Sequence, residues 1–115
     1  MDSIDEGWRP LVRLLIAEID RLNEGDGPEI RIAQIKEKFG GLRFYTSCDE
    51  HLNPEYVALL KLVTQVEVAC SHICEACGST AEVTSRSQLG KTWGWVKTYC
   101  ALCHHKRDAV ELAKE

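Results

Sequence analysis

The sequence predicts an α+β fold: a helix, a β-hairpin, a second helix, and a small cysteine-bearing module that ends in a helix. Three observations predict this order. Apolar residues recur at helical spacing in two separate stretches. A Gly-Gly pair stands between two short stretches of alternating apolar and polar residues. Two Cys-x-x-Cys pairs follow in the C-terminal part of the 115-residue chain.

The first helix is expected from Pro10 to Leu22. Proline is favourable in the first helical turn, because the backbone N–H that it lacks would have no partner there. Five apolar residues fall on one face at helical spacing, and the charged residues avoid that face. They are Val12, Leu15, Ile16, Ile19 and Leu22. The helix should end in the segment 23–28, NEGDGP.

A β-hairpin is expected next. Alternation begins at Ile30 and allows a strand as far as Ile35, and a second strand should end near Thr46. Gly40 and Gly41 lie between them, and we expect both to take the positive φ that a tight hairpin turn needs. The second strand should place Leu42, Phe44 and Thr46 on one face, with Arg43 and Tyr45 on the other.

The second helix is expected from Asn53 to about Ser71. Asn53 is a favourable N-cap, Pro54 suits the first turn, and Glu55 complements the helix dipole. β-Branched residues are frequent here, so packing rather than helix propensity must hold this helix. Its apolar stripe consists of Tyr56, Leu59, Leu60, Val63, Val66 and Cys70.

Four cysteines carry the strongest chemical signal. Cys74 and Cys77 form one pair, and Cys100 and Cys103 form another after the spacer 78–99. Two thiolates three positions apart can hold one face of a tetrahedral ion, and a second pair brought back by a hairpin completes the coordination. Four soft ligands leave no open position for water, which is typical of structural zinc. We therefore expect one structural Zn²⁺ per chain, bound by these four cysteines.

The chain around these cysteines predicts a treble-clef-like finger. Strands are expected at 81–87 and 95–99, joined around Leu89-Gly90, and a helix should begin at Cys100 and continue through Ala113. A zinc ribbon, with a third strand after the second pair, is the alternative.

No linker separates the second helix from the first cysteine pair. Residues 1–73 are therefore expected to form a helix-hairpin-helix part, and residues 74–115 a zinc-finger module. We expect the module to pack on the first part as a single compact unit.

Other ligand sets use residues near these cysteines. His104 or His105 could replace Cys103, which would give a Cys₃His site. The run from Cys100 to His104 also matches the c-type haem attachment pattern, but haem requires export and would leave the first pair idle.

The remaining cysteine and histidine positions carry weaker signals. Cys48 and His51 have metal-like spacing but no second pair beside them. His72 stands close to the first metal pair, where it could orient a thiolate. Cys70 is expected in the core as a small apolar residue.

Charge is distributed unevenly along the chain, whose formal net charge is −4. Residues 1–70 hold 8 basic and 13 acidic side chains, a net charge of −5, whereas residues 71–115 hold 6 and 5, a net charge of +1. An acidic chain repels phosphate at long range, so a basic protein is a more suitable partner than nucleic acid.

The N-terminal segment 1–6 is acidic and lacks the basic and apolar regions of a signal peptide. No apolar run is long enough to span a membrane. We therefore expect a cytoplasmic protein without a membrane partner, in a reducing compartment that favours metal ligation over disulfides.

A nucleic-acid-binding face is the alternative for the second hairpin, because basic residues interleaved with aromatic ones can bind single strands by charge and stacking. These residues are Arg86, Lys91, Trp93, Trp95, Lys97 and Tyr99. We favour the interpretation that the tryptophans cover the zinc module and do not bind nucleic acid, since the net charge is negative and no run of Arg or Lys is present.

No catalytic signature accompanies these features. The sequence contains no nucleophile elbow, P-loop, GxGxxG or HExxH motif. The His-x-Glu that zinc deaminases place before their Cys-x-x-Cys is also absent. We therefore expect a protein that is not an enzyme.

The stretch from Gln34 to Tyr45, QIKEKFGGLRFY, follows Gly7-Trp8 and a helix. With the C-terminal Cys-x-x-Cys-Gly, a Trp-Val pair and the second metal pair, it resembles a family of small bacterial and phage proteins over most of the chain. Family members look like accessory genes of phages, prophages and toxin or defence loci. The resemblance implies a protein that binds and blocks, or adapts, another protein. Members often end the second pair with histidine, where this chain has Cys103-His104.

Together, these features predict a non-enzymatic, zinc-stabilised protein-binding protein, an immunity protein or phage-type inhibitor that binds and blocks a basic partner. An acidic surface suits this role, since charge complementarity speeds association. The alternative is a small zinc-finger regulator that binds nucleic acid.

Overall fold

The computed structural model describes residues 4–87 and 96–114. The elements are α1 (Arg9–Asn23), β1 (Ile30–Lys38), β2 (Gly41–Cys48), α2 (Pro54–Cys70), β3 (Val83–Arg86), β4 (Lys97–Cys100) and α3 (Ala101–Lys114). The strands form two separate antiparallel hairpins, β1-β2 and β3-β4. The expected α+β fold is confirmed, and a helix, not the third strand of a zinc ribbon, follows the second hairpin.

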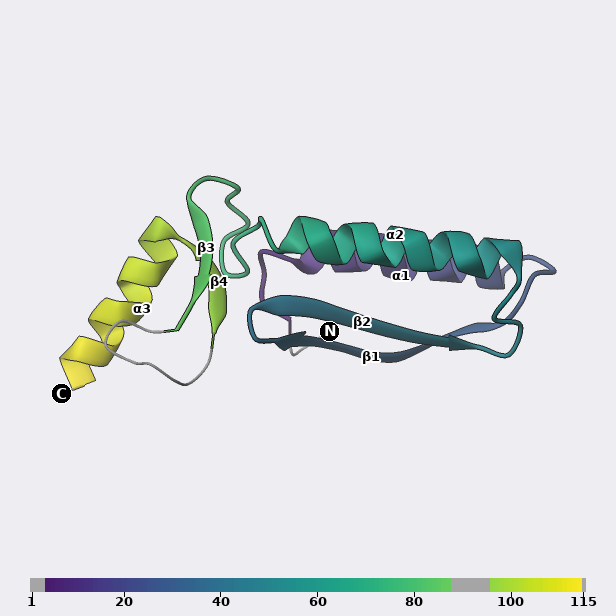
Figure 1. Ribbon diagram of the computed structural model, residues 1–115, viewed down its shortest axis with the longest axis horizontal. Helices are drawn as coiled ribbons and strands as arrows, with labels where there is room; N and C mark the ends of the chain where they lie inside the picture. The colour runs from purple at the N-terminus through teal and green to yellow at the C-terminus, as the bar shows by residue number, and fades with distance from the viewer. Residues whose placement is uncertain (1–3, 88–95, 115) are drawn as a thin grey trace.

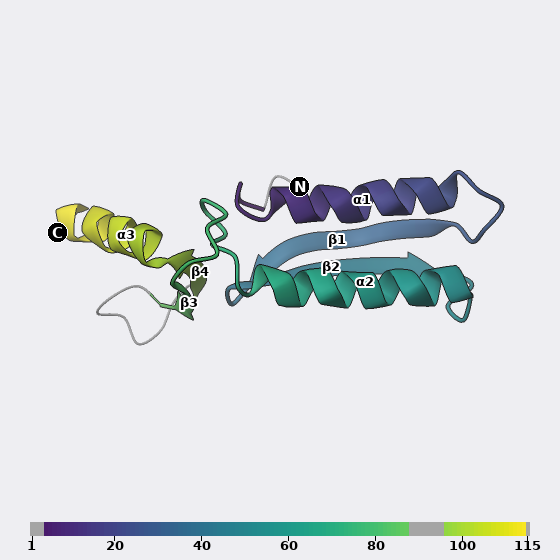
Figure 2. The same ribbon diagram turned by 90° about the horizontal axis from the view of Figure 1, so that it is seen from above.

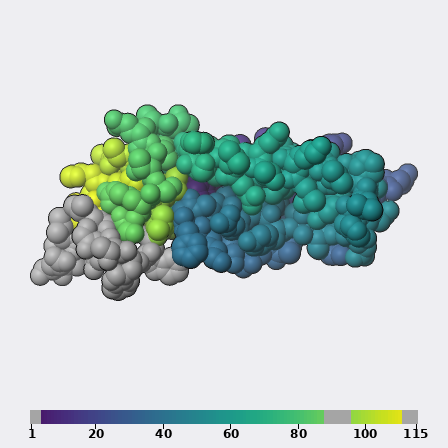
Figure 3. All heavy atoms as spheres, in the orientation of Figure 1, coloured from purple at the N-terminus to yellow at the C-terminus, as the bar shows by residue number. Residues whose placement is uncertain are grey.

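Both long helices, α1 and α2, lie on one face of the β1-β2 hairpin (Figures 1 and 2). The molecule measures 57 × 24 × 20 Å along its principal axes, and the β3-β4 hairpin with α3 stands at one end of it (Figure 3). The core between helices and hairpin consists of Ile4, Trp8, Val12, Leu15, Ile19, Leu22, Ile30, Leu42, Phe44, Tyr56, Leu59, Val63, Val66 and Cys70. No helix in the described ranges is long and apolar enough to cross a membrane.

The helices bury the expected faces with one exception. The start of α2 is as predicted, since the Asn53 side chain accepts a hydrogen bond from the Glu55 N–H at 2.9 Å. Leu60 was expected in the apolar stripe of α2 but is 40% exposed. Neighbouring residues of a helix project about 100° apart, and Leu60 lies at the edge of the stripe, on the side turned away from the core. Leu59 takes the buried position.

The β1-β2 hairpin closes through a two-residue turn, Phe39-Gly40, with Lys38 opposite Gly41. The φ angle is 54° at Phe39 and 78° at Gly40, which is the pattern of a type I′ turn. The expectation of a positive φ at Gly41 is wrong, because Gly41 already belongs to β2. A bulky phenylalanine takes the left-handed conformation in its place, which is rare and strained.

The segment before α1 contacts the loop of the first cysteine pair and so joins the two parts of the fold. The Gly7 N–H donates to the Glu75 carbonyl at 2.8 Å, and the buried Trp8 donates through Nε1 to the Ile73 carbonyl at 2.8 Å. The backbones approach so closely that a Cβ built on Gly7 would lie 1.9 Å from the carbonyl oxygen of Cys74. Only glycine therefore fits at position 7, because any side chain would overlap the backbone of the first cysteine pair.

Strand β3 (Val83–Arg86) lies within the expected stretch 81–87, and β4 (Lys97–Cys100) overlaps the expected stretch 95–99 but begins two residues later and ends one residue later. The predicted turn at Leu89-Gly90 and the predicted strand start at Trp95 lie outside the described residues.

Replacement of Gly7 by alanine should destabilise the fold by at least about 2 kcal/mol, because the new methyl group would overlap backbone atoms that no side-chain rotation can move. Thermal and urea unfolding of the variant would measure this loss. Gly25→Ala is the matched control, since a Cβ there meets its nearest atom at 3.7 Å. The control should leave stability unchanged or raise it by about 0.4–1 kcal/mol. Equal effects of the two substitutions would contradict the close approach at Gly7.

Candidate metal centre

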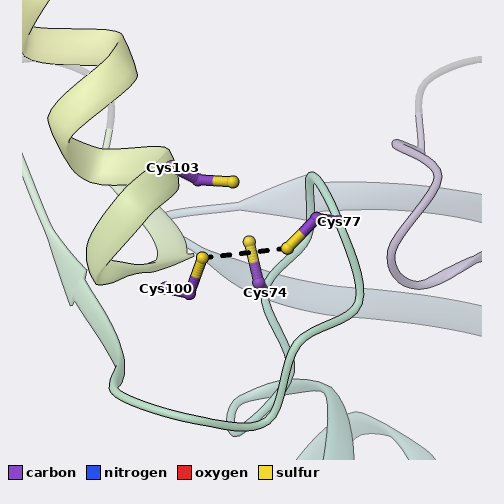
Figure 4. A group of neighbouring side chains, drawn as sticks. All are labelled: Cys74, Cys77, Cys100 and Cys103. Carbon is purple, nitrogen blue, oxygen red and sulfur yellow. Dashed lines mark hydrogen bonds between the residues drawn. The ribbon is translucent and has the colours of Figure 1, made fainter.

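The four predicted ligands converge on one point. The Sγ atoms of Cys74, Cys77, Cys100 and Cys103 all lie within 4.8 Å of one another. Figure 4 shows the four sulfurs facing a common centre, with Cys77 and Cys100 3.7 Å apart. All six cysteines of the chain fall within the described ranges, and none forms a disulfide. The cluster can therefore hold one metal ion.

The first pair lies on a tight turn directly after α2. The Cys74 N–H donates to the Ser79 carbonyl at 2.8 Å, and the Gly78 N–H donates to the Cys74 carbonyl at 2.9 Å. Gly78 has a φ of 85°, which glycine adopts without steric cost. This turn brings the Cys77 sulfur back beside that of Cys74.

The second pair comes from the junction of β4 and α3. Cys100 is the last residue of β4 and Cys103 lies in the first turn of α3. The β3-β4 pairing, with Val83 opposite Cys100, returns this junction to the first pair. A knuckle, a hairpin and a helix that begins at the second pair form the expected treble-clef arrangement.

Proton affinity differs among the four thiols. Burial opposes ionisation of Cys74, but the backbone N–H groups of Cys100, Cys77 and Ala76 outweigh burial and lower the pKa of Cys74 to about 7. Burial, with further contributions from the neighbouring cysteines, raises the pKa of Cys103 to about 12. A divalent cation favours the thiolate form of every ligand, so metal binding would release protons from this cluster.

The alternative ligands point elsewhere. His104 is buried, and its Nε2 donates to the Thr84 carbonyl at 2.8 Å. Its Nδ1 has no hydrogen-bond partner among the described residues. Neither His104 nor His105 belongs to the sulfur cluster, so a Cys₃His site finds no support in the geometry.

The other cysteine and histidine positions lie apart from the metal centre. Cys48 packs partly buried against the main core, and His51 and His72 are exposed. Cys70 is fully buried, as expected, and burial raises its pKa to about 12.

Glu75, between the first two cysteines of the cluster, is a buried residue of the site that the spacing of the cysteines did not reveal. The residue is 1% exposed. Oε2 accepts from the Thr98 N–H at 2.7 Å and Oε1 accepts from Lys97 Nζ at 3.3 Å. A single carboxylate in a Cys-x-x-Cys loop is a weak sequence signal, because most such residues are solvated.

The second hairpin meets the tip of the first. The Thr98 hydroxyl donates to the Gly40 carbonyl at 2.5 Å. Lys97 Nζ also lies 3.6 Å from an oxygen of Glu37, whose Oε1 accepts from the Gly40 N–H at 3.1 Å. The turn of β1-β2 is thus held against β4.

The basic and aromatic residues proposed as a nucleic-acid face on the second hairpin are engaged in internal contacts where the structure describes them. Arg86 pairs with Asp108 at 2.8 Å, Lys97 pairs with Glu75, and the Tyr99 ring lies 5.3 Å from that of His104. Lys91, Trp93 and Trp95 lie outside the described residues.

Comparison of the chain with protein-family models, with curated proteins and with solved structures gives no match.

Elemental analysis of exhaustively dialysed protein should find one metal ion per chain. Cys77→Ser should abolish the metal, because three thiolates leave the tetrahedron open. Cys48→Ser and Cys70→Ser are the matched controls and should retain one ion, since neither sulfur belongs to the cluster. Metal-free folded wild-type protein, or loss of metal in a control variant, would contradict the assignment.

Proposed function

We propose that the metal centre holds one structural Zn²⁺. A Zn–S bond of about 2.3 Å gives a tetrahedral edge of about 3.8 Å, close to the 3.7 Å between the sulfurs of Cys77 and Cys100. Thiolates are soft ligands that favour zinc over magnesium or calcium. Four protein ligands complete the tetrahedron, which supports a structural role rather than catalysis.

The proposed activity is binding of a basic protein partner, and the observation that carries it is the clustering of acidic side chains at one end of the molecule. This acidic end consists of Asp20, Glu24, Asp26, Glu29, Asp49, Glu50 and Glu55, all of them exposed. They lie at the end of α1, in the two loops that flank the hairpin, and at the start of α2 (Figure 1). Glu37 does not belong to the acidic end, because it lies at the other end of the hairpin beside Lys97.

The two loops of the acidic end lie side by side, since residues in or next to one loop contact residues in or next to the other. A Cβ on Gly27 would lie 3.5 Å from Glu55 Oε1, and Asp49 pairs with Arg31 at 3.1 Å. Segments 24–29 and 49–55 therefore form one surface. Its negative charge would steer a basic partner and raise the association rate.

An exposed apolar patch begins beside this acidic end. Leu52 precedes α2, and Val57 and Leu60 line a shallow depression on its outer side with Lys61 and Thr64. Interfaces combine an apolar centre with a polar rim, and Leu60 would supply the apolar part. An apolar patch beside the acidic end supports binding of a folded protein rather than attraction of cations by charge alone.

The resemblance to small bacterial and phage accessory proteins supports an immunity protein or a phage-type inhibitor in the cytoplasm. Such a protein blocks a nucleic-acid-acting partner by covering its basic surface. On this proposal the protein is not an enzyme, and zinc serves to order the C-terminal module.

Removal of zinc should destabilise the C-terminal module, because a structural zinc site contributes on the order of 10–16 kcal/mol to ordering its ligands. Treatment with a chelator should lower the midpoint of thermal unfolding, and added Zn²⁺ but not Mg²⁺ should restore it. An unchanged midpoint after verified metal loss would rule out a structural role.

Charge reversal at the acidic end should slow association with a basic partner captured from the native host. The variant combines Glu24→Lys, Asp26→Lys and Glu50→Lys. Its association rate at low salt should fall about tenfold or more, and salt should have less effect on the variant than on the wild-type protein. Biolayer interferometry between 50 and 300 mM salt would measure both.

The matched control places the same three reversals elsewhere, as Asp5→Lys, Glu6→Lys and Glu82→Lys. These exposed residues lie before α1 and before β3. Equal slowing in both triple variants would show that net charge, not the acidic end, governs association. Capture only through nuclease-sensitive complexes would count against a protein partner.

A further inference from the structure

No described helix or strand covers the face of the β1-β2 hairpin that points away from α1 and α2 (Figure 1). Cross-strand partners share a face, and successive residues alternate between faces. Phe44 and Leu42 face the helices, so their neighbours Arg43 and Tyr45 face outward. The outward residues, here called the outer hairpin face, are Arg31, Gln34, Lys36, Lys38, Arg43, Tyr45 and Ser47. A β-bulge between Ile32 and Gln34 allows Arg31 and Gln34 to share this face.

The outer hairpin face is strongly cationic. Four of its residues are Arg or Lys and none is acidic. Arg31 pairs with Asp49, but no ion pair between described residues involves Lys36, Lys38 or Arg43. Glu37, the one acidic residue of the two strands, faces inward to Gly40 and Lys97. Three cations are therefore available to an anionic ligand.

Two exposed aromatic rings stand beside these cations. Tyr45 is 45% exposed and Phe39, at the turn, is 69% exposed. Lys36 Nζ lies 5.9 Å from the centre of the Tyr45 ring, and Lys38 Nζ lies 5.6 Å from that of Phe39. The face thus presents two pairs of a cation and a flat ring, one along the strands and one at the turn.

The strained turn adds an independent observation. Phe39 keeps a φ of 54° and a largely exposed ring, although asparagine or glycine would suit this position of a type I′ turn better. Neither core packing nor turn geometry accounts for an aromatic side chain there. Strained residues of this kind are concentrated at functional sites.

We propose that the outer hairpin face binds single-stranded nucleic acid. Lys36 and Lys38 lie on one face of β1, where alternate residues are about 6.6–7 Å apart, and Arg43 on β2 is the cross-strand partner of Lys36. The three cations can therefore contact neighbouring phosphates. Exposed rings on an antiparallel sheet stack with unpaired bases, which no duplex offers. An acidic polypeptide would use the cations but would leave the two rings without a function, so the aromatic residues favour nucleic acid.

The formal net charge of −4 does not oppose this binding. The acidic end lies at the opposite end of the hairpin from Lys36, Lys38 and the turn (Figure 1). Strand β1 has nine residues, which span about 30 Å at about 3.3 Å per residue. The screening length is about 8 Å at physiological ionic strength, much shorter than the hairpin. Local charge therefore governs contact with phosphate. The proposal stands independently of the proposed protein partner, which uses the acidic end.

Fluorescence anisotropy with labelled 12-nucleotide single-stranded DNA and RNA, between 50 and 200 mM KCl, tests the proposal on the zinc-loaded protein. Three phosphate contacts predict a slope of about −2 for the logarithm of the binding constant against that of salt concentration. Duplex DNA of the same sequence should bind at least about tenfold more weakly.

The double substitution Lys36→Gln with Arg43→Gln removes two positive charges that face each other across the strands. It should weaken binding about tenfold or more and reduce the magnitude of the salt dependence to a slope of about −0.7. Arg13→Gln with Lys61→Gln makes the same change of net charge on the exposed sides of α1 and α2 and should leave binding unchanged. Equal losses in both pairs, or no binding by the wild-type protein at 50 mM KCl, would overturn the proposal.

Aromatic variants separate stacking from charge. Tyr45→Ala should weaken binding roughly 5- to 150-fold at an unchanged salt slope, whereas Tyr45→Phe should retain it, because stacking needs the ring and not the hydroxyl. Retained binding in Tyr45→Ala would overturn the stacking role.

Replacement of Phe39 by asparagine tests the turn with two independent readouts. Relief of the strained φ should raise the thermal midpoint by about 3–6 °C, while loss of the ring should weaken binding. A more stable variant with unchanged affinity would remove the turn from the binding surface.

Competing occupants have their own signatures. Polyglutamate that binds as tightly as the oligonucleotide would assign the face to an acidic polypeptide and overturn the proposal. A second copy of the chain is the other competing occupant. If the protein self-associates in analytical ultracentrifugation, does not bind the oligonucleotide, and loses self-association in the Lys36→Gln, Arg43→Gln variant, the face binds the acidic end of a second copy. That result would also overturn the proposal.

Discussion

The structure depends on the buried carboxylate of Glu75 and the backbone around it. Burial raises the pKa of Glu75 above its ordinary value, while the Thr98 N–H and the Lys97 ammonium oppose that rise. Its side chain binds β4 and its backbone carbonyl accepts from Gly7. One residue between two metal ligands thus joins the metal centre, the second hairpin and the segment before α1. Loss of any partner would leave a buried polar group unsatisfied, which costs about 1–3 kcal/mol.

The same junction restrains the tip of the first hairpin. Thr98 Oγ1 donates to the Gly40 carbonyl, and the side-chain oxygens of Ser85 and Thr98 lie 2.6 Å apart. Since β4 ends at Cys100 of the sulfur cluster, any order that a bound metal gave the module would extend to the turn that carries Phe39. A strained turn persists only when surrounding contacts hold it, and these contacts supply that restraint. Zinc would therefore support the outer hairpin face without touching it.

Charge is separated on this molecule in a way that its net value hides. The hairpin carries cations on its outer face, and the loops and helix ends that flank its open end carry exposed carboxylates. The formal charge of −4 averages these two surfaces. Because salt screens charges beyond about 8 Å, a partner responds to the surface that it meets. On the two proposals, a basic protein and an anionic strand would therefore bind different parts of one small chain.

The sequence by itself determined the elements and the metal ligands, because both depend on local spacing. Helical periodicity identifies the core face of α1 at Val12, Leu15, Ile19 and Leu22, and two cysteine pairs separated by a hairpin-length spacer leave few arrangements other than a shared ion. Only the tertiary structure decided what depends on contacts between distant residues. The turn falls at Phe39-Gly40 because the strand register, not glycine preference, sets its place, and Leu60 is exposed because it lies at the edge of the apolar stripe, on the side turned away from the core. The role of Glu75 needed the approach of Gly7 and Thr98, and Lys36 and Arg43 form one cationic surface because antiparallel pairing puts them opposite each other, although no run of basic residues is present in the sequence.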